Sequence, residues 1–127
     1  MPLLLESAQS FDYCLLKLTY HVTFTAMEKL RPHYPLQLVL AIAAQSTGIR
    51  FTVISYNGAA ELGLEESDMH AVIKNLNRTV FYKSMTSYGD NTIWQDVYRP
   101  TYKSVQLYIK ITLEETERVL VISFKRR

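Results

Sequence analysis

Cysteine is nearly absent from this sequence, because Cys14 is the single one among 127 residues. One thiol excludes an internal disulfide and any zinc site built from several cysteines. Histidine is also sparse, and His21, His33 and His70 all precede the last 57 residues, so a catalytic pair of imidazoles in the second half is excluded. No clustered spacing of His, Cys, Asp and Glu is typical of a metal centre. We therefore expect neither a metal ion nor a cofactor.

Glycine is scarce too, and the four glycines form no phosphate-binding loop. No serine lies in the sequence context of a nucleophile elbow, which argues against a serine hydrolase. The first residues lack a basic segment, and Glu6 and Asp12 interrupt their apolar stretch. That pattern fits neither a signal peptide nor a membrane span. We expect a cytoplasmic protein that does not associate with membranes.

The length predicts one domain with one hydrophobic core. The net charge of +2 conceals an asymmetry between the two parts of the chain. Residues 1–80 contain six Lys/Arg and seven Asp/Glu, whereas residues 81–127 contain eight and five. The basic second part indicates an anionic partner, although an ordinary solvated surface also fits this composition.

Residues 1–26 differ from the rest, with apolar residues that follow no helical period. They are either an extra strand or contact arm, or a poorly ordered extension translated from an upstream start. We favour the extension, because chain ends without anchoring contacts are commonly disordered. The functional domain is then expected at 27–127, beginning at Met27.

Two helices and several strands can be predicted from the pattern. Pro35 suits the first turn of a helix that covers Leu36–Ala44. A second helix, with Ser67 as its N-cap, places Met69 and the apolar residues three, four and seven positions later on one face. From Val80 onward, polar and apolar residues alternate as in strands. The predicted fold class is α+β, with N-terminal helices packed on a twisted, mainly antiparallel sheet.

The segment between these helices allows two interpretations. Phe51–Tyr56 has the composition of a strand, and Asn57-Gly58 after it is typical of a turn. Alternatively, Thr52 caps a helix that Gly63 ends. The local pattern alone favours the strand.

The block from residue 81 to residue 100 is the most informative part of the sequence. It combines cations and an amide with three tyrosines and the single tryptophan. Cations beside aromatic rings suit a surface that holds a phosphodiester backbone and stacks unpaired bases. RNA is therefore the first substrate to consider, although we interpret Trp94 as a packing residue rather than a stacking platform. The residues concerned are Lys83, Arg99, Gln95, Tyr82, Tyr88, Tyr98 and Trp94.

Alternation sorts the remaining functional groups by face. In the strand 105–112 the odd positions are apolar and must face the core, which turns Gln106, Tyr108 and Lys110 outward. The sheet can then bring Lys83, Gln95, Tyr108 and Lys125 to one concave surface. Such groups suffice for metal-free RNA cleavage, since RNA supplies its own 2′-OH nucleophile and a lysine crowded by cations has a lowered pKa.

Long sequence blocks in the same order resemble the MqsR-type toxins of bacterial toxin–antitoxin pairs, which are mRNA-cleaving endoribonucleases with a RelE-like fold. The resemblance covers about a hundred residues. Its blocks are Met27–Lys29, Pro32–His33, Glu61–Leu64, Phe81–Thr86, Trp94–Pro100, Tyr108–Thr112 and Val121–Lys125.

The resemblance implies a catalytic set and two partners. The family cuts single-stranded mRNA at GCU-type sites without the ribosome, and a zinc-containing, DNA-binding antitoxin encoded beside it neutralises the toxin. By analogy with related ribonucleases, attack by the 2′-OH gives a 2′,3′-cyclic phosphate. The catalytic residues fall on Lys83, Gln95, Tyr108 and Lys125, with Tyr82 and Met85 as RNA-binding neighbours. Arg99, a cation of the block 81–100, completes the RNA-binding residues that we expect.

The family also places a helix over Phe51–Leu62, which makes the Thr52-capped helix the adopted expectation. Two features depart from the family: Asn91 stands where a histidine is common, and residues 1–26 have no counterpart. Asn91 puts the target preference in doubt more than the activity. The alternative to a nuclease is a catalytically silent module that binds RNA or acts as a co-repressor with the antitoxin.

Overall fold

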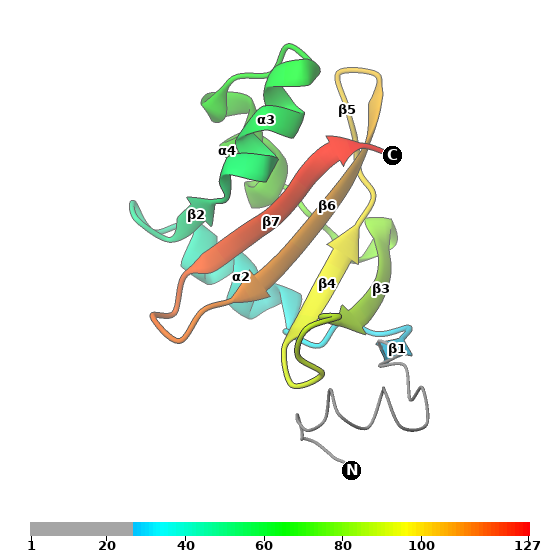
Figure 1. The fold of residues 1–127 in the computed structure, drawn as a ribbon. Coiled ribbons are helices and arrows are strands. Elements are labelled where there is room, and N and C mark those ends of the chain that lie inside the picture. Colours follow the sequence, from blue (N-terminus) through cyan, green and yellow to red (C-terminus); the bar gives the residue numbers. More distant parts are fainter. Residues whose placement is uncertain (1–26) are drawn as a thin grey trace.

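A seven-stranded sheet dominates the computed structural model, which describes residues 27–127 (Figure 1). The expectations for residues 1–26 lie outside the described part. The strand order is β1-β3-β4-β6-β7-β2, and β5 pairs with β6 off this path. The strands are β1 (Glu28–Lys29), β2 (Ile49–Phe51), β3 (Phe81–Thr86), β4 (Trp94–Tyr98), β5 (Thr101–Tyr102), β6 (Val105–Leu113) and β7 (Val119–Arg126).

All strand pairs are antiparallel except β2 with β7. Three α-helices, α2 (Leu36–Ala43), α3 (Val53–Glu61) and α4 (Glu66–Lys74), precede the main strands in the described chain. A single 3₁₀ turn at Arg78–Val80 leads into β3. The α+β class with a mainly antiparallel sheet is therefore confirmed. Within residues 27–127 no helix has the length and apolar character needed to cross a lipid bilayer.

The helix ends follow local hydrogen-bond chemistry. The carbonyl of Pro35 accepts from the backbone N–H of Leu38, so α2 begins where the sequence predicts. For α3 the strand interpretation of Phe51–Tyr56 is wrong beyond Phe51, and the helix is confirmed. The Thr52 hydroxyl accepts from the Ser55 N–H at 3.1 Å, and Gly63 (φ +74°) follows the helix in the left-handed conformation.

The predicted cap of α4 is wrong by two residues. The N-cap is Glu65, and Ser67 lies inside the first turn. The Asp68 carboxylate accepts from the Glu65 N–H at 2.9 Å, satisfying a backbone donor that the helix leaves free. Asp68 is thus the residue that fixes where this helix begins.

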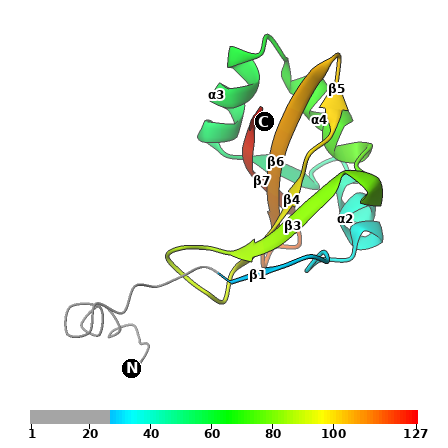
Figure 2. The ribbon, with the colours of Figure 1, turned by 90° about the vertical axis from the view of Figure 1, so that its right-hand side faces the viewer.

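The core lies between the sheet and helices α2 and α4. In the edge view these two helices lie on one side of the sheet (Figure 2). Helix α3 lies along the β7 edge, where it contacts both β7 and α4, and its Ala59 belongs to the same core. The central odd positions of β6, Leu107, Ile109 and Ile111, are buried, as alternation predicts. The opposite face of the sheet, called the outer face below, receives the even positions. Fully buried core residues include Val39, Ala43, Ile73, Leu107, Ile109, Ile111, Val119 and Val121.

Helix α3 packs against the end of β7 through a glycine. A Cβ atom on Gly58 would lie 2.0 Å from the carbonyl oxygen of Phe124, which is backbone and cannot turn aside. Any side chain at this position would push helix and strand apart. The close approach fixes the segment of β7 from which Lys125 projects.

Candidate active site

The strand register gathers three lysines on the outer face. Lys83 of β3 pairs with Val97 of β4, which in turn pairs with Lys110 of β6. Lys110 pairs with Ser123 of β7, and Lys125 follows two residues later on the same face. Val97 is fully buried between the first two lysines. Lys83, Lys110 and Lys125 are called the lysine cluster below.

Lys83 is held by a carboxylate from the edge strand. Its Nζ donates to Glu28 Oε2 at 2.5 Å, across the antiparallel pair that β1 makes with β3. This hydrogen bond raises the pKa of Lys83 above the ordinary lysine value. Lys83 is therefore fixed as a cation, and the lowered pKa anticipated for a crowded lysine does not occur at this residue. No local sequence pattern predicts that Glu28 contacts Lys83, because only the pairing of β1 with β3 brings Glu28 to the site.

Lys110 is the crowded lysine. Its side chain is half-buried in the middle of the outer face. Burial lowers the pKa of Lys110, and the positive charges of Lys125 and Lys83 lower it further. Alternation already turned this residue outward, two residues after Tyr108 on the same strand. That shared face was a signal for Lys110, although the resemblance did not include it in the catalytic set.

Tyr108 stands beside the lysine cluster. It pairs with Lys125, whose Nζ lies 5.2 Å from the centroid of the tyrosine ring. Burial raises the pKa of the Tyr108 phenol, and the nearby charge of Lys83 opposes this only in part. The phenol therefore stays protonated at neutral pH and can donate a hydrogen bond or a proton.

An exposed tyrosine and an arginine extend the cationic surface. A register shift between Phe81 and Lys83 turns Tyr82 outward, and 43% of its surface is exposed. The Arg99 guanidinium lies 4.0 Å from the centroid of the Tyr82 ring. Both residues line a small cleft of about 200 Å³. The two predicted RNA-binding residues thus form one stacked pair beside the lysine cluster.

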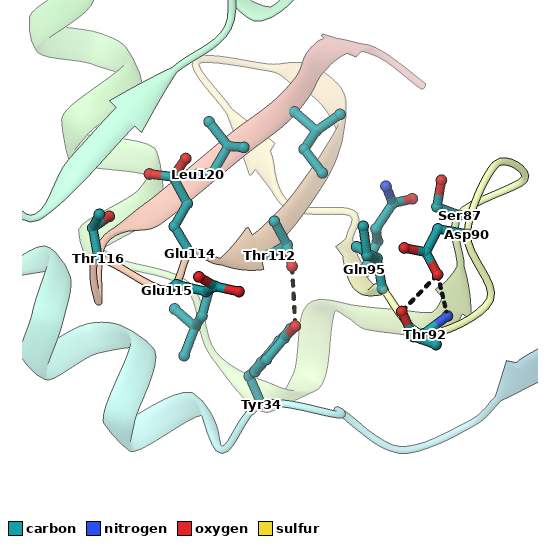
Figure 3. A pocket seen from close by; sticks show the side chains of 13 residues that line it. Tyr34, Ser87, Asp90, Thr92, Gln95, Thr112, Glu114, Glu115, Thr116 and Leu120 are labelled. Atoms are coloured by element: carbon teal, nitrogen blue, oxygen red, sulfur yellow. Dashed lines mark hydrogen bonds between the residues drawn. The ribbon is translucent and has the colours of Figure 1, made fainter.

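Gln95 and Met85 lie farther along the same face. They pair with each other across β3 and β4. Gln95 lies two residues along β4 from Val97, the residue that pairs with Lys110, which is a distance of about 7 Å. Gln95 lines a groove of about 790 Å³ at the end of the sheet (Figure 3). Met85 is only 8% exposed, so little of its side chain is open to a ligand.

The opposite face of β4 is structural. Trp94 stacks on His33, with ring centroids 5.2 Å apart and an angle of 10° between the planes, and Lys29 Nζ lies 4.1 Å from the tryptophan ring. The buried Asp96 accepts from the backbone N–H groups of His33 and Tyr34 at 3.0 and 2.9 Å. The interpretation of Trp94 as a packing residue is confirmed, and His33 lies away from the lysine cluster.

The outer face therefore combines cations with a neutral phenol. Among residues 27–127 no group of three His, Cys, Asp or Glu residues is placed to hold a metal ion. The lysines can neutralise an anionic backbone, and Tyr108 can protonate a leaving oxygen. Such a surface suits a phosphodiester in which the nucleophile belongs to the substrate.

Comparison with known proteins agrees with this chemistry. Residues 31–126 match the family model described as "Motility quorum-sensing regulator, toxin of MqsA". The chain is also 45% identical over 101 residues to the mRNA interferase toxin MqsR of Escherichia coli (strain K12), covering 80% of this chain and 100% of that protein. The chain therefore belongs to the MqsR toxin family.

Proposed function

We propose that this chain is an endoribonuclease toxin that cleaves single-stranded mRNA without a metal ion. The observation that carries the proposal is the lysine cluster beside a phenol that remains protonated. The name of the Escherichia coli relative, an mRNA interferase toxin, supports the same reaction. RNA brings its own nucleophile, so the protein needs only to align the backbone, stabilise charge and move protons.

Each residue then has a distinct role. The 2′-OH oxygen attacks the adjacent phosphorus, and its proton passes to Lys110 in its deprotonated form, whose share the lowered pKa increases. The bond from phosphorus to the 5′-oxygen breaks, and Tyr108 protonates that oxygen. Lys83 and Lys125 stabilise the negative charge on the phosphorane. The products are a 2′,3′-cyclic phosphate and a free 5′-OH, and Gln95 positions the RNA.

The finer features of the family are part of the proposal. We expect cleavage at GCU-type sequences and neutralisation by a cognate antitoxin that contains zinc and binds DNA. The description of the family as a toxin of MqsA supports an antitoxin partner. Tyr82, Arg99 and Met85 remain the proposed RNA-binding residues, with Met85 contributing least because it is nearly buried.

The test is a cleavage assay in EDTA with a defined single-stranded RNA that holds several GCU sites. The wild type is compared with Lys83→Ala/Lys125→Ala and with Lys74→Ala/Lys103→Ala, which removes the same charge far from the cluster. We expect cleavage by the wild type and the control, and a loss of at least about 10²-fold in the first variant. Products should carry cyclic phosphate and 5′-OH ends.

Two outcomes would overturn the proposal. A folded wild type that binds this RNA and leaves it intact would favour the silent binding module. Cleavage that EDTA abolishes and Mg²⁺ restores would show metal-dependent chemistry instead.

A further inference from the structure

The groove beside the lysine cluster has a different chemical character from the cluster itself. The groove lies between the loop that joins β3 to β4 and the turn that joins β6 to β7, and its volume is about 790 Å³. One wall carries Asp90, Thr92 and Gln95, and the other carries Glu114 and Glu115 (Figure 3). No lysine or arginine is among the residues that line it. A phosphate would therefore be repelled at this end of the outer face.

Two carboxylates in the groove are available to a ligand. Asp90 Oδ1 accepts from the backbone N–H of Thr92 at 2.8 Å and from its hydroxyl at 2.5 Å, which fixes the carboxylate and leaves Oδ2 to accept from a ligand. The pKa of Asp90 is lowered by these hydrogen bonds, so the group is ionised. Glu114, in contrast, is engaged by Arg50 at 2.6 Å. Asp90 and Glu115 supply the free acceptor oxygens.

The floor of the groove is apolar and the rim is polar. Leu120 and Ile122 line it from β7, and the bulge between Lys110 and Ile111 in the pairing of β6 with β7 places Ile122 there. Ile93, 43% exposed, adds an apolar side chain from the loop. An apolar floor edged by hydrogen-bonding groups suits a nucleobase.

Gln95 connects the groove to the lysine cluster. Its side chain lines the groove, and its backbone lies about 7 Å along β4 from the residue that pairs with Lys110. One nucleotide spans a comparable distance between its phosphate and the edge of its base. An RNA whose phosphate lies on the cluster can therefore place a neighbouring base in the groove.

We propose that the groove is a nucleobase subsite that selects a base with an exocyclic amino group next to the scissile phosphate. Asp90 accepts from the amino group, and the Gln95 amide pairs with the adjacent ring atom. Uracil is rejected, because two carbonyl oxygens flank its single N–H and would face carboxylates. The inference rests on the proposed nuclease function and specifies how that site chooses its target.

The test measures base preference at each position around the cut. A pool of randomised single-stranded RNA is cleaved in EDTA by the wild type, by Asp90→Asn and by Glu61→Gln, a control that removes an exposed carboxylate from the end of α3. We expect one position near the cut to favour amino-bearing bases at least about tenfold over uracil in the wild type and the control. Asp90→Asn should lose most of this preference, whereas the Glu61→Gln control should keep both the preference and the total cleavage rate of the wild type.

A chemical probe separates the amino group from the rest of the base. At the selected position, guanosine is replaced by inosine, cytidine by zebularine or adenosine by purine riboside, each of which lacks the amino group. The wild type should cleave the analogue about tenfold more slowly, and Asp90→Asn should treat both alike. Equal cleavage of both RNAs by the wild type would overturn the proposal.

Fluorescence anisotropy measures binding of the same RNAs and thereby keeps the two proposals distinguishable. If the wild type cleaves RNA but Asp90→Asn keeps its base profile, the groove proposal alone fails. If the wild type discriminates between amino and analogue RNA in binding but cleaves neither, the nuclease fails and the groove survives. If Asp90→Asn changes only neutralisation by the antitoxin, the groove is a protein-binding surface and the proposal is overturned.

Discussion

The two ends of the outer face differ in charge although the same strands build them. At one end Lys83, Lys110 and Lys125 gather around Tyr108. At the other end the groove is lined by hydroxyls, carboxylates and one amide. The strands β4 and β6 run through both ends of the outer face. On β6, Lys110 and the groove residue Thr112 are only two positions apart.

This contrast teaches how a small sheet can orient a nucleic acid. A uniformly basic face would hold a phosphodiester in many positions along its length, because phosphate contacts carry no sequence information. An acidic groove next to the cations excludes phosphate and accepts bases, so the backbone has one favourable position. On the two proposals above, the cluster supplies affinity and chemistry, and the groove supplies the register.

The largest expected effect comes from removing the amine at the centre of the cluster. Lys110→Met keeps an unbranched side chain that reaches as far as Cε and loses the amine that is proposed to accept the 2′-OH proton. We expect kcat to fall by about 10²–10⁴-fold, the usual contribution of a general base. Single-turnover cleavage of a saturating RNA measures it, with Lys103→Met at the turn between β5 and β6 as the matched control.

A charge-preserving variant separates proton transfer from binding. Arginine stays protonated at any accessible pH, so Lys110→Arg should bind RNA and fail to cleave it. Cleavage by Lys110→Arg within about threefold of the wild type would remove Lys110 from proton transfer and leave it as a binding cation. Thermal unfolding of each variant checks that the fold is intact.

A titration of individual lysines sharpens the comparison without any substrate. Burial and two neighbouring cations lower the pKa of Lys110, whereas hydrogen bonding to Asp68 raises the pKa of Lys103. Lys110 should therefore lose its proton at a lower pH than Lys103. Carbon-13 NMR of labelled lysines measures both, and the variants Lys110→Arg and Lys103→Arg assign the two signals.

The order of the two transitions decides the outcome. If Lys110 titrates together with Lys103 or above it, the cluster is too hydrated for its charges to act on one another. The choice of Lys110 as the proton acceptor would then be wrong. In Lys125→Gln the transition of Lys110 should move to higher pH, because one repelling charge is gone.

Much of this arrangement could be predicted because it depends on local periodicity. Alternation along β6 separates core positions from outward ones, and it correctly turned Tyr108 and Lys110 to the same face. The apolar stripe that starts at Met69 predicts the buried face of α4. Such patterns are set by the two-residue and 3.6-residue repeats, so a single sequence is enough to detect them.

The remainder depends on contacts between distant residues. The segment after Phe51 has strand-like composition, yet the Thr52 side chain bonds to the Ile122 carbonyl and caps a helix instead. Glu28 reaches Lys83 only through the pairing of β1 with β3, and the two residues are 55 positions apart. The groove forms only where the β3–β4 loop and the β6–β7 turn lie side by side at one end of the sheet. No local sequence pattern predicts that these two segments are neighbours.

The smallest effect is expected at the groove, from Tyr34→Phe. The Tyr34 hydroxyl shares a hydrogen bond with the Thr112 hydroxyl at 3.0 Å (Figure 3). It also lies 3.3 Å from the Trp94 carbonyl, to which the Thr112 hydroxyl donates at 2.8 Å. Removing the tyrosine hydroxyl leaves the bond from Thr112 to Trp94 in place, so the free energy of unfolding should fall by only about 0.5–1.5 kcal/mol, which urea denaturation measures. Because the change touches only the groove wall, the base preference should weaken while Lys110 titrates as in the wild type. A shift in the Lys110 transition would show that the two ends of the outer face are coupled, and the division of labour between cluster and groove would then have to be abandoned.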